Sequence, residues 1–193
     1  MRIFLAGASG VLGMRLIPLL VEQGHAVAAM TRTPEKAPAL RALDGEPVVC
    51  DVYDARALTE AVVAFAPDLV LHQLTDLPDD PKRIPEVGAA NNRIRREGTA
   101  NLLSAARAAS VSRFIAQSVA WALPHDGGAA VTDLERQVLE AQGVVLRYGQ
   151  FYGPGTYHEA DVPPYPAIQI DDAALRTVQL LDAPSGVLTI AEP

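Results

Sequence analysis

Residues 7–13 read GASGVLG and stand between the strand-like run RIFLAG, residues 2–7, and the helical pattern VLGMRLIPLLVEQG, residues 11–24. In such a strand–turn–helix unit the first glycine permits a tight turn, the second lets the backbone approach a pyrophosphate, and the third lets the helix pack on the strand. The start of the helix adds free N–H groups and the positive end of its dipole. The stretch therefore predicts a dinucleotide-binding loop built from Gly7, Ser9, Gly10, Val11, Leu12 and Gly13.

Short apolar segments alternate with helical patterns along most of the chain. After the first unit, strand-like segments occupy residues 25–32, 46–51, 68–75, 112–120 and 144–149, and helical patterns occupy 34–43, 55–66, 86–109 and 131–143. Strands rich in Val, Ile and Leu that lack polar alternation are typical of a parallel sheet covered on both faces. We predict a doubly wound α/β (Rossmann) fold. Residues 1–193 form one domain, with a core of residues 1–148 and a reduced substrate-side segment of residues 149–193.

The composition narrows the classes of partner. The chain has 193 residues, of which 49% are hydrophobic and 20% charged, as in one globular domain. Its net charge of −7 argues against nucleic acid as a partner, and no apolar run has the length of a membrane span. The single cysteine, Cys50, excludes an internal disulfide, so a cytoplasmic location is expected. No Cys/His spacing predicts a metal site.

The end of the second strand bears on the choice of dinucleotide. NAD-binding proteins usually place Asp or Glu there, but no carboxylate lies between Glu22 and Glu35. Arg32 stands in that stretch and can pair with a 2′-phosphate, assisted by Thr31 or Arg15. The alternative is that Arg32 is a solvated surface residue. We expect NADP, with NAD possible.

Several segments together resemble one known family. They are GASGVLG (7–13), CDVYD (50–54), NNRIRREGTANLLSAARAA (91–109), RFIAQSVA (113–120), LRYGQFYGPGT (146–156), IQIDDAALRTVQLL (168–181) and GVLTIAEP (186–193). In this order they resemble the extended short-chain dehydrogenase/reductase family, in its NAD-dependent epimerase/dehydratase branch and of atypical form. The resemblance implies that Asp51 and Val52 border the adenine, that Leu74 and Thr75 border the nicotinamide ribose, that Ser118 is the catalytic serine, and that residues 148–153 wall the nicotinamide.

The sequence departs from this family at its general acid/base. Family members carry a Tyr followed four residues later by a Lys, whose charge lowers the pKa of the phenol. This chain has two lysines, Lys36 and Lys82, both before that region. With Glu135 aligned to the family's glutamate, Gly127 and Val131 stand at the Tyr and Lys positions. The chain is also shorter than extended members, so we expect a small or open substrate pocket, or one completed by a second subunit.

Two tyrosines near the expected nicotinamide side remain as candidate donors. Tyr148 or Tyr152, as a neutral phenol, can donate a hydrogen bond to a substrate carbonyl, with Ser118 as a second donor. The alternative is that both tyrosines only pack beside the cofactor.

Other polar residues have simpler interpretations. His72 is expected to be a buried, hydrogen-bonded histidine, and PHDGG, with His125 and Asp126, an ordinary turn. Asp171 is expected to cap a helix. His158, Glu159 and Asp161 fit a solvated loop better than a metal site, and Trp121 lines a pocket or fills an apolar patch.

These observations leave three hypotheses for function. The first is an NAD(P)-dependent oxidoreductase or epimerase-like enzyme of atypical catalytic design, which reduces or isomerises a small organic carbonyl compound. The second is a non-catalytic NADP-binding sensor or regulatory protein. The third is a structural remnant that binds no cofactor. Apolar positions in the helix LERQVLEAQ, residues 134–142, suggest a homodimer.

Overall fold

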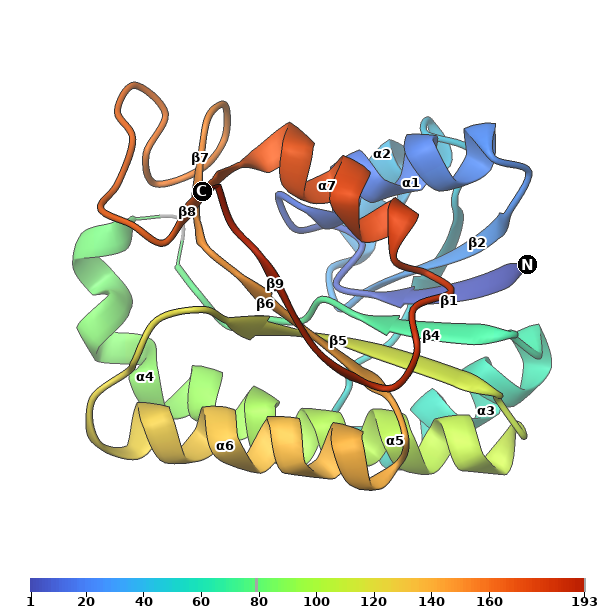
Figure 1. The fold of residues 1–193 in the computed structure, drawn as a ribbon. Coiled ribbons are helices and arrows are strands. Elements are labelled where there is room, and N and C mark those ends of the chain that lie inside the picture. Colours follow the sequence, from blue (N-terminus) through green and yellow to red (C-terminus); the bar gives the residue numbers. More distant parts are fainter. Residues whose placement is uncertain (79, 193) are drawn as a thin grey trace.

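The computed structural model describes residues 1–78 and 80–192, and its centre is a seven-stranded parallel sheet (Figure 1). The strand order is β3-β2-β1-β4-β5-β6-β9. The strands are β1 (Arg2–Ala6), β2 (Ala26–Thr31), β3 (Glu46–Val49), β4 (Leu69–His72), β5 (Arg113–Val119), β6 (Val144–Tyr148) and β9 (Gly186–Ile190). The predicted doubly wound α/β fold is confirmed.

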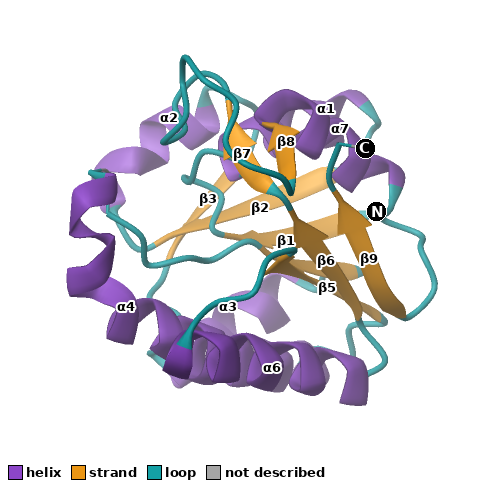
Figure 2. Ribbon diagram, turned by 60° about the vertical axis from the view of Figure 1, so that its left-hand side comes forward, coloured by secondary structure: helices purple, strands orange, loops and turns teal. Residues whose placement is uncertain are grey.

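Helices cover both faces of the sheet, as Figures 1 and 2 show. One face carries α1 (Gly13–Glu22), α2 (Ala37–Arg41) and α7 (Ile170–Gln179), and the other carries α3 (Ala55–Phe65), α4 (Ile84–Arg93), α5 (Thr99–Ala108) and α6 (His125–Glu140). Short helical turns η1 (Pro34–Lys36) and η2 (Pro81–Arg83) precede α2 and α4. This layering gives the sheet a separate apolar core on each side.

Each core is built from alternate residues of the same strands. Ile3 and Leu5 face α1 and α7, whereas Phe4 and Ala6 face α3 and α5. Successive side chains of a strand point to opposite faces, so a strand buried on both sides must be apolar throughout. This is the physical reason for the continuous apolar runs in the sequence.

The structure differs from the sequence-based expectation in the long helix. The pattern predicted over residues 86–109 is divided into α4 and α5 by a π-helical segment, η3 (Ile94–Gly98). Such segments add one residue to a helical turn and occur frequently at functional sites. They leave the apolar periodicity on either side intact, which is why the sequence reads as one helix.

The C-terminal segment adds a strand to the main sheet and a helix to one of its faces. β9 pairs with β6 in the main sheet, and α7 packs on α1. Between them and β6 lies a small parallel pair, β7 (Gln150–Tyr152) and β8 (Ala167–Gln169). Pro193 lies outside the described residues.

Candidate functional site: the carboxyl edge of the sheet

The glycine loop connects the carboxyl end of β1 to α1, where two glycines are required by crowding. Gly7 has a φ of +92°, and a Cβ there would lie 2.5 Å from the backbone oxygen of Gln73. A Cβ on Gly13 would lie 2.3 Å from the oxygen of Gly7 and 2.6 Å from that of Ala8. These distances exclude any larger side chain, so Gly7 and Gly13 set the turn and the approach of the helix.

Gly10 is different, because the fold itself does not demand a glycine there. A Cβ at this position would meet only the oxygen of Gly7, at 3.4 Å, and the residue is exposed. The first turn of α1 has no side-chain cap and no acidic residue. An open helix N-terminus beside a bare backbone is the cradle that a pyrophosphate needs. The loop therefore fits the dinucleotide expected from the sequence.

Ser9 of this loop lies against the end of β2, where Thr31 and Arg32 stand. The hydroxyls of Ser9 and Thr31 are 2.9 Å apart. Arg32 is 58% exposed, and its Nη2 lies 2.7 Å from Oδ1 of Asp76. That hydrogen bond is the main reason why the pKa of Arg32 is raised. The sequence around the end of β2 contains the base Arg32 and no acid, but the fold brings the acidic Asp76 next to it.

Arg15 is not part of this group, contrary to the expectation that it assists Arg32. Its guanidinium donates to Asp171 at 2.5 Å and to the backbone oxygens of Val11 and Pro154. Asp171 in turn is not the cap of α7. The side chain of Gln169 accepts from the N–H groups of Asp171 and Asp172 and caps the helix instead.

The expected adenine side follows β3. Asp51 is exposed, and its carboxylate accepts a 2.9 Å hydrogen bond from the N–H of Tyr53. Val52 is buried and packs with the core beneath α3 and α5. The Arg93 guanidinium stacks 3.8 Å from the centroid of the Tyr53 ring. Since the hydroxyl of Tyr53 is buried and unpartnered, this wall of the site retains one free polar group.

The end of β4 faces the glycine loop across the switch in strand order. His72 is buried, and its ring nitrogens contact the Thr99 hydroxyl at 3.0 Å and the Leu74 N–H at 3.2 Å. Burial lowers the pKa of His72 to about 4, so the ring is neutral at pH 7. Leu74 is half-buried and Thr75 is exposed at the edge of the sheet. His72 is the buried, hydrogen-bonded histidine expected from the sequence.

Ser118 near the end of β5 points beneath α6. It is 5% exposed, and its hydroxyl donates to Glu135 at 2.6 Å. Glu135 also accepts two hydrogen bonds from Arg147, at 2.8 and 2.5 Å. Burial raises the pKa of the Glu135 carboxyl, but the hydrogen bonds from Arg147 and Ser118 outweigh it and leave the pKa lowered. In this arrangement the serine hydroxyl links β5 to α6, and Glu135 extends the link to Arg147 of β6.

The two tyrosines assigned as donors occupy unlike environments. Tyr148 is 1% exposed, and its hydroxyl lies 2.7 Å from that of Thr177 in α7 and 3.4 Å from the amide of Gln73. Burial raises its pKa. Tyr152 is half-buried and donates to Glu192 at 2.7 Å, which raises its pKa as well. The structure thus corrects the expectation of two substrate-facing phenols: Tyr148 belongs to the core, because even-numbered residues of β6 face α7.

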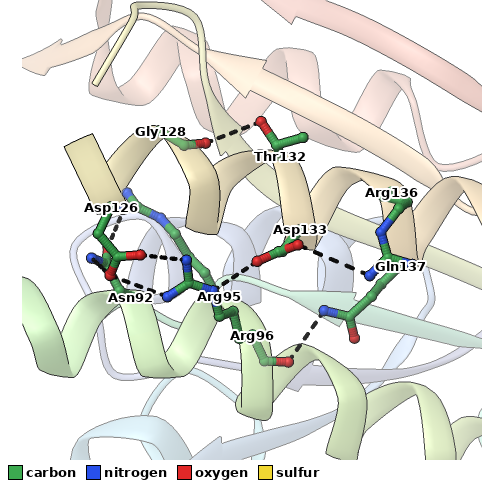
Figure 3. A network of polar contacts seen from close by, with 9 residues as sticks. All are labelled: Asn92, Arg95, Arg96, Asp126, Gly128, Thr132, Asp133, Arg136 and Gln137. Atoms are coloured by element: carbon green, nitrogen blue, oxygen red, sulfur yellow. Dashed lines mark hydrogen bonds and ion pairs between the residues drawn. The ribbon is translucent and has the colours of Figure 1, made fainter. Parts of the chain in front are cut away.

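The first turn of α6 lies where the family's tyrosine is expected, and PHDGG begins this helix rather than forming a turn. Asp126 does not pair with His125. It accepts hydrogen bonds from Arg96 at 2.6 and 3.1 Å and from Asn92 at 2.9 Å (Figure 3). A Cβ on Gly127 would lie 3.4 Å from Cβ of Leu123 and 4.0 Å from Oδ1 of Asn92, so this position lies between the loop before α6 and α4.

Arg96 joins η3 to α6 along a larger network. Besides Asp126, its guanidinium binds Asp133 at 2.7 Å, and its backbone oxygen accepts from Gln137 (Figure 3). These contacts fix α6 beside η3. No lysine follows Lys82 in the sequence, so α6 carries no cation at the family's lysine position.

Two further candidates from the sequence form no defined site among the described residues. His158 and Asp161 are 3.5 Å apart in an exposed loop, and no group of three or more metal-binding side chains occurs among the described residues. Trp121 is half-buried in the loop after β5. A cavity of about 290 Å³, lined in part by Arg113 and Gln142, lies at the amino edge of the sheet, opposite the loop.

Sequence reasoning missed three side chains at this edge: Asp76, Arg93 and Arg95. Asp76 stands in the loop after β4 and Arg93 in the last turn of α4, and the pairing of Asp76 with Arg32 has no local signal in the sequence. Only the spacing Arg93–Glu97, an i,i+4 pair, indicates an exposed helix face in the sequence.

The fold and the glycine cradle define a Rossmann dinucleotide-binding protein. Residues 7–147 match the NAD(P)H-binding family, and the chain belongs to this family. The resemblance to short-chain dehydrogenase/reductase proteins seen in the sequence is confirmed at this level.

Among curated proteins, the chain is similar to a 3-diazoavenalumate denitrifying reductase of a Streptomyces species. The two are 41% identical over 188 residues, which cover 83% of this chain and 60% of the relative. It is also similar to a 3-beta-hydroxysteroid dehydrogenase of Mycolicibacterium neoaurum, with 31% identity over 59% of this chain and 31% of the relative. The chain thus spans about 60% or less of the length of these relatives.

Solved structures of similar fold include UDP-glucose 4-epimerases. That of Thermotoga maritima superposes with a TM-score of 0.81 and 19% identity, covering 99% of this chain and 77% of that protein. That of Thermus thermophilus, in complex with NAD, gives a TM-score of 0.78 and 19% identity, covering 99% of this chain and 78% of that protein.

The helices within the described residues include none with the length and hydropathy of a membrane span.

Proposed function

We propose that this protein is an NAD(P)H-dependent reductase of a small organic electrophile. The observation that carries the proposal is the cradle at Gly10, where an exposed glycine that the fold does not require stands before an uncapped helix N-terminus. The loop from Gly7 to Gly13 binds the pyrophosphate, Asp51 and Val52 border the adenine, and Leu74 and Thr75 border the nicotinamide ribose. Bound NAD(P)H supplies a hydride.

The preferred cofactor in this proposal is NADP. Arg32 is largely exposed and is the base nearest the end of β2. Its pairing with Asp76 means that a 2′-phosphate has to replace a carboxylate as the partner of the guanidinium. Because a phosphate carries more charge and offers three acceptor oxygens, the exchange is favourable. NAD, held through Asp76, is the alternative that the same pair allows.

The catalytic design follows from what the chain offers at the end of β5 and β6. Ser118 and Tyr148 support the fold through their buried hydroxyls, which leaves Tyr152 as the proton donor. Its pKa is raised by Glu192, so it is a neutral phenol that donates and does not abstract protons. Reduction is therefore favoured over alcohol oxidation.

The acceptor is a carbonyl or a diazo compound. A carbonyl carbon that takes a hydride becomes an alkoxide and needs a proton from a donor such as Tyr152. A diazonium carbon that takes a hydride forms a C–H bond as N₂ departs, and no proton is needed. The name of the Streptomyces relative, a denitrifying reductase of a diazo compound, supports this second acceptor for a chain that has no lysine in α6.

Deuterium transfer tests the proposal directly. The purified protein is incubated with NADPH or NADH deuterated at the reactive carbon, and with either benzaldehyde or 4-methylbenzenediazonium. Mass spectrometry then measures deuterium on product carbon, with Gly10→Ala and protein-free mixtures as controls. Transfer above both controls supports the reductase. Failure to bind either dinucleotide would overturn it.

A non-catalytic NADP-binding sensor is the second candidate, favoured by the burial of the Ser118 and Tyr148 hydroxyls. Tight dinucleotide binding without transfer to either acceptor would support it. In both cases the partner is a small molecule, and the net charge of −7 disfavours nucleic acid.

A homodimer and a cytoplasmic location remain proposals. Leu134 and Val138 of α6 are buried against the sheet, which leaves Leu139, 38% exposed, as the large apolar residue of that stripe on the surface. Light scattering at micromolar concentration tests the dimer. Cys50 is buried and free, in keeping with a reducing compartment.

A further inference from the structure

Arg95 occupies an unusual electrostatic position in η3. Its side chain is half-buried, and among the described residues its hydrogen-bond partner is Asn92, with a long contact of 3.4 Å from Nη1 to Oδ1. Among the side chains that the structure describes, no carboxylate forms an ion pair with it. Burial alone lowers its pKa. The structure thus holds a partly desolvated cation whose charge is not balanced.

The neighbouring arginines, Arg93 and Arg96, both form ion pairs, so the lack of an acidic partner among the described residues is particular to Arg95. Arg93 lies 2.6 Å from Glu97, and Arg96 lies 2.6 Å from Asp126 and 2.7 Å from Asp133. Burying a cation without a partner is costly, and such residues are usually paired. A ligand of opposite charge would remove that cost.

The location of Arg95 connects it to the site. Thr99, one turn later, hydrogen-bonds His72 at the carboxyl end of β4. Arg95 therefore lies beyond that end of the sheet, on the side to which ligands bind in open α/β folds. Figure 3 shows its side chain extending from η3 past Asp126 to the first turn of α6. There Gly127 carries no side chain, and a Cβ on it would contact the side chain of Leu123 at 3.4 Å and Oδ1 of Asn92 at 4.0 Å.

We propose that Arg95 binds a carboxylate of the substrate at the carboxyl edge of the sheet. A guanidinium offers two parallel N–H donors that match the two oxygens of a carboxylate. The π-helical turn brings this residue to the edge, while Arg96 holds α6 in place. The inference rests on the proposed reductase and adds a class of substrate to it, a small carboxylic acid whose electrophilic carbon lies elsewhere in the molecule.

The first experiment compares two probes of one shape and different charge. Ligand-observed NMR measures the binding of benzoate and benzamide to the whole protein, with and without NADP. We expect benzoate to bind about tenfold more tightly than benzamide, and Arg95→Gln to abolish this difference. Arg95→Lys keeps the positive charge but loses the two parallel N–H donors, so it should retain part of the preference for benzoate.

Arg136→Gln is the matched control, because Arg136 is an exposed helical arginine paired with Glu140. It should leave the benzoate preference unchanged. Thermal unfolding of each variant shows that the fold is kept. Equal binding of benzoate by wild type and folded Arg95→Gln, or no preference for benzoate in the wild type, would overturn the proposal.

The outcome is separable from that of the proposed function. Benzoate binding that depends on Arg95 in a protein that transfers no hydride would uphold the carboxylate site and refute the reductase. Hydride transfer by a protein that shows no preference for benzoate over benzamide would support the reductase and refute the carboxylate site.

Discussion

Replacing Gly10 by alanine separates cofactor binding from folding. The added Cβ would meet one protein atom, the oxygen of Gly7, at 3.4 Å, which is ordinary contact. The free energy of unfolding should therefore change by no more than about 0.5 kcal/mol. The methyl group instead occupies the space through which a phosphate approaches the backbone. Losing one charge-assisted hydrogen bond costs about 1.5–3 kcal/mol, or roughly a ten- to hundredfold loss of NADPH affinity.

Calorimetric titration with NADPH and a thermal melt measure the two effects on the same samples. Gly88→Ala is the control for a glycine in a helix, since a Cβ there meets nothing within 4 Å. It should leave binding unchanged. Gly13→Ala is the opposite control, because its Cβ would lie 2.3 Å from a backbone oxygen and the melting temperature should fall sharply. Wild-type affinity in Gly10→Ala, or a loss of stability as large as that of Gly13→Ala, would refute the reasoning.

Three further predictions address the choice of cofactor, the proton donor and pH. Arg32→Ala should lower the affinity for NADPH about tenfold and leave the affinity for NADH unaffected, whereas Asp76→Asn should raise the affinity for NADPH. The same calorimetric titration measures both affinities. Equal effects on the two dinucleotides would contradict the assignment of Arg32 to the 2′-phosphate. Tyr152→Phe should slow carbonyl reduction by about a hundredfold and spare diazonium reduction. Tyr148→Phe should spare both rates and lower only stability, so parallel loss in both tyrosine variants would count against this division. His72 has a pKa lowered from 6.5 to about 4 by burial, so its neutral form stabilises the native state above pH 6.5 and this contribution is lost as the pH falls towards 4. Between about pH 7.5 and about pH 5 the loss is about 2 kcal/mol, measured by urea unfolding and absent in His72→Gln.

The fold can be predicted from the sequence because its signals are local. A strand buried on both faces is apolar at every position, and a helix start beside a glycine loop is a contiguous pattern of a few residues. Gly7, Gly10 and Gly13 are therefore assigned by their spacing within seven residues of chain. The π-helical η3 is not predictable in this way, since one additional residue in a turn leaves the apolar periodicity of α4 and α5 in place.

The candidate catalytic residues show the limit of pattern reasoning. Ser118, Tyr148 and Tyr152 are singled out by their place in a motif, but a strand residue points to one face or the other according to its register. That register sends Ser118 to Glu135 beneath α6 and Tyr148 to Thr177 beneath α7. The chemistry open to each hydroxyl depends on this direction.

The sequence by itself determined the order of strands and helices as far as β6, the glycine loop and the absence of a lysine in α6. Only the tertiary structure decided which charges meet. Arg32 pairs with Asp76, which is 44 positions away in the sequence, and Arg96 pairs with Asp126, which is 30 positions away. Arg95 has no acidic partner among the side chains that the structure describes. Electrostatic partners are set by distances in space, which a linear pattern does not encode. The balance of charge at the carboxyl edge therefore follows from the packing of η3 and α6.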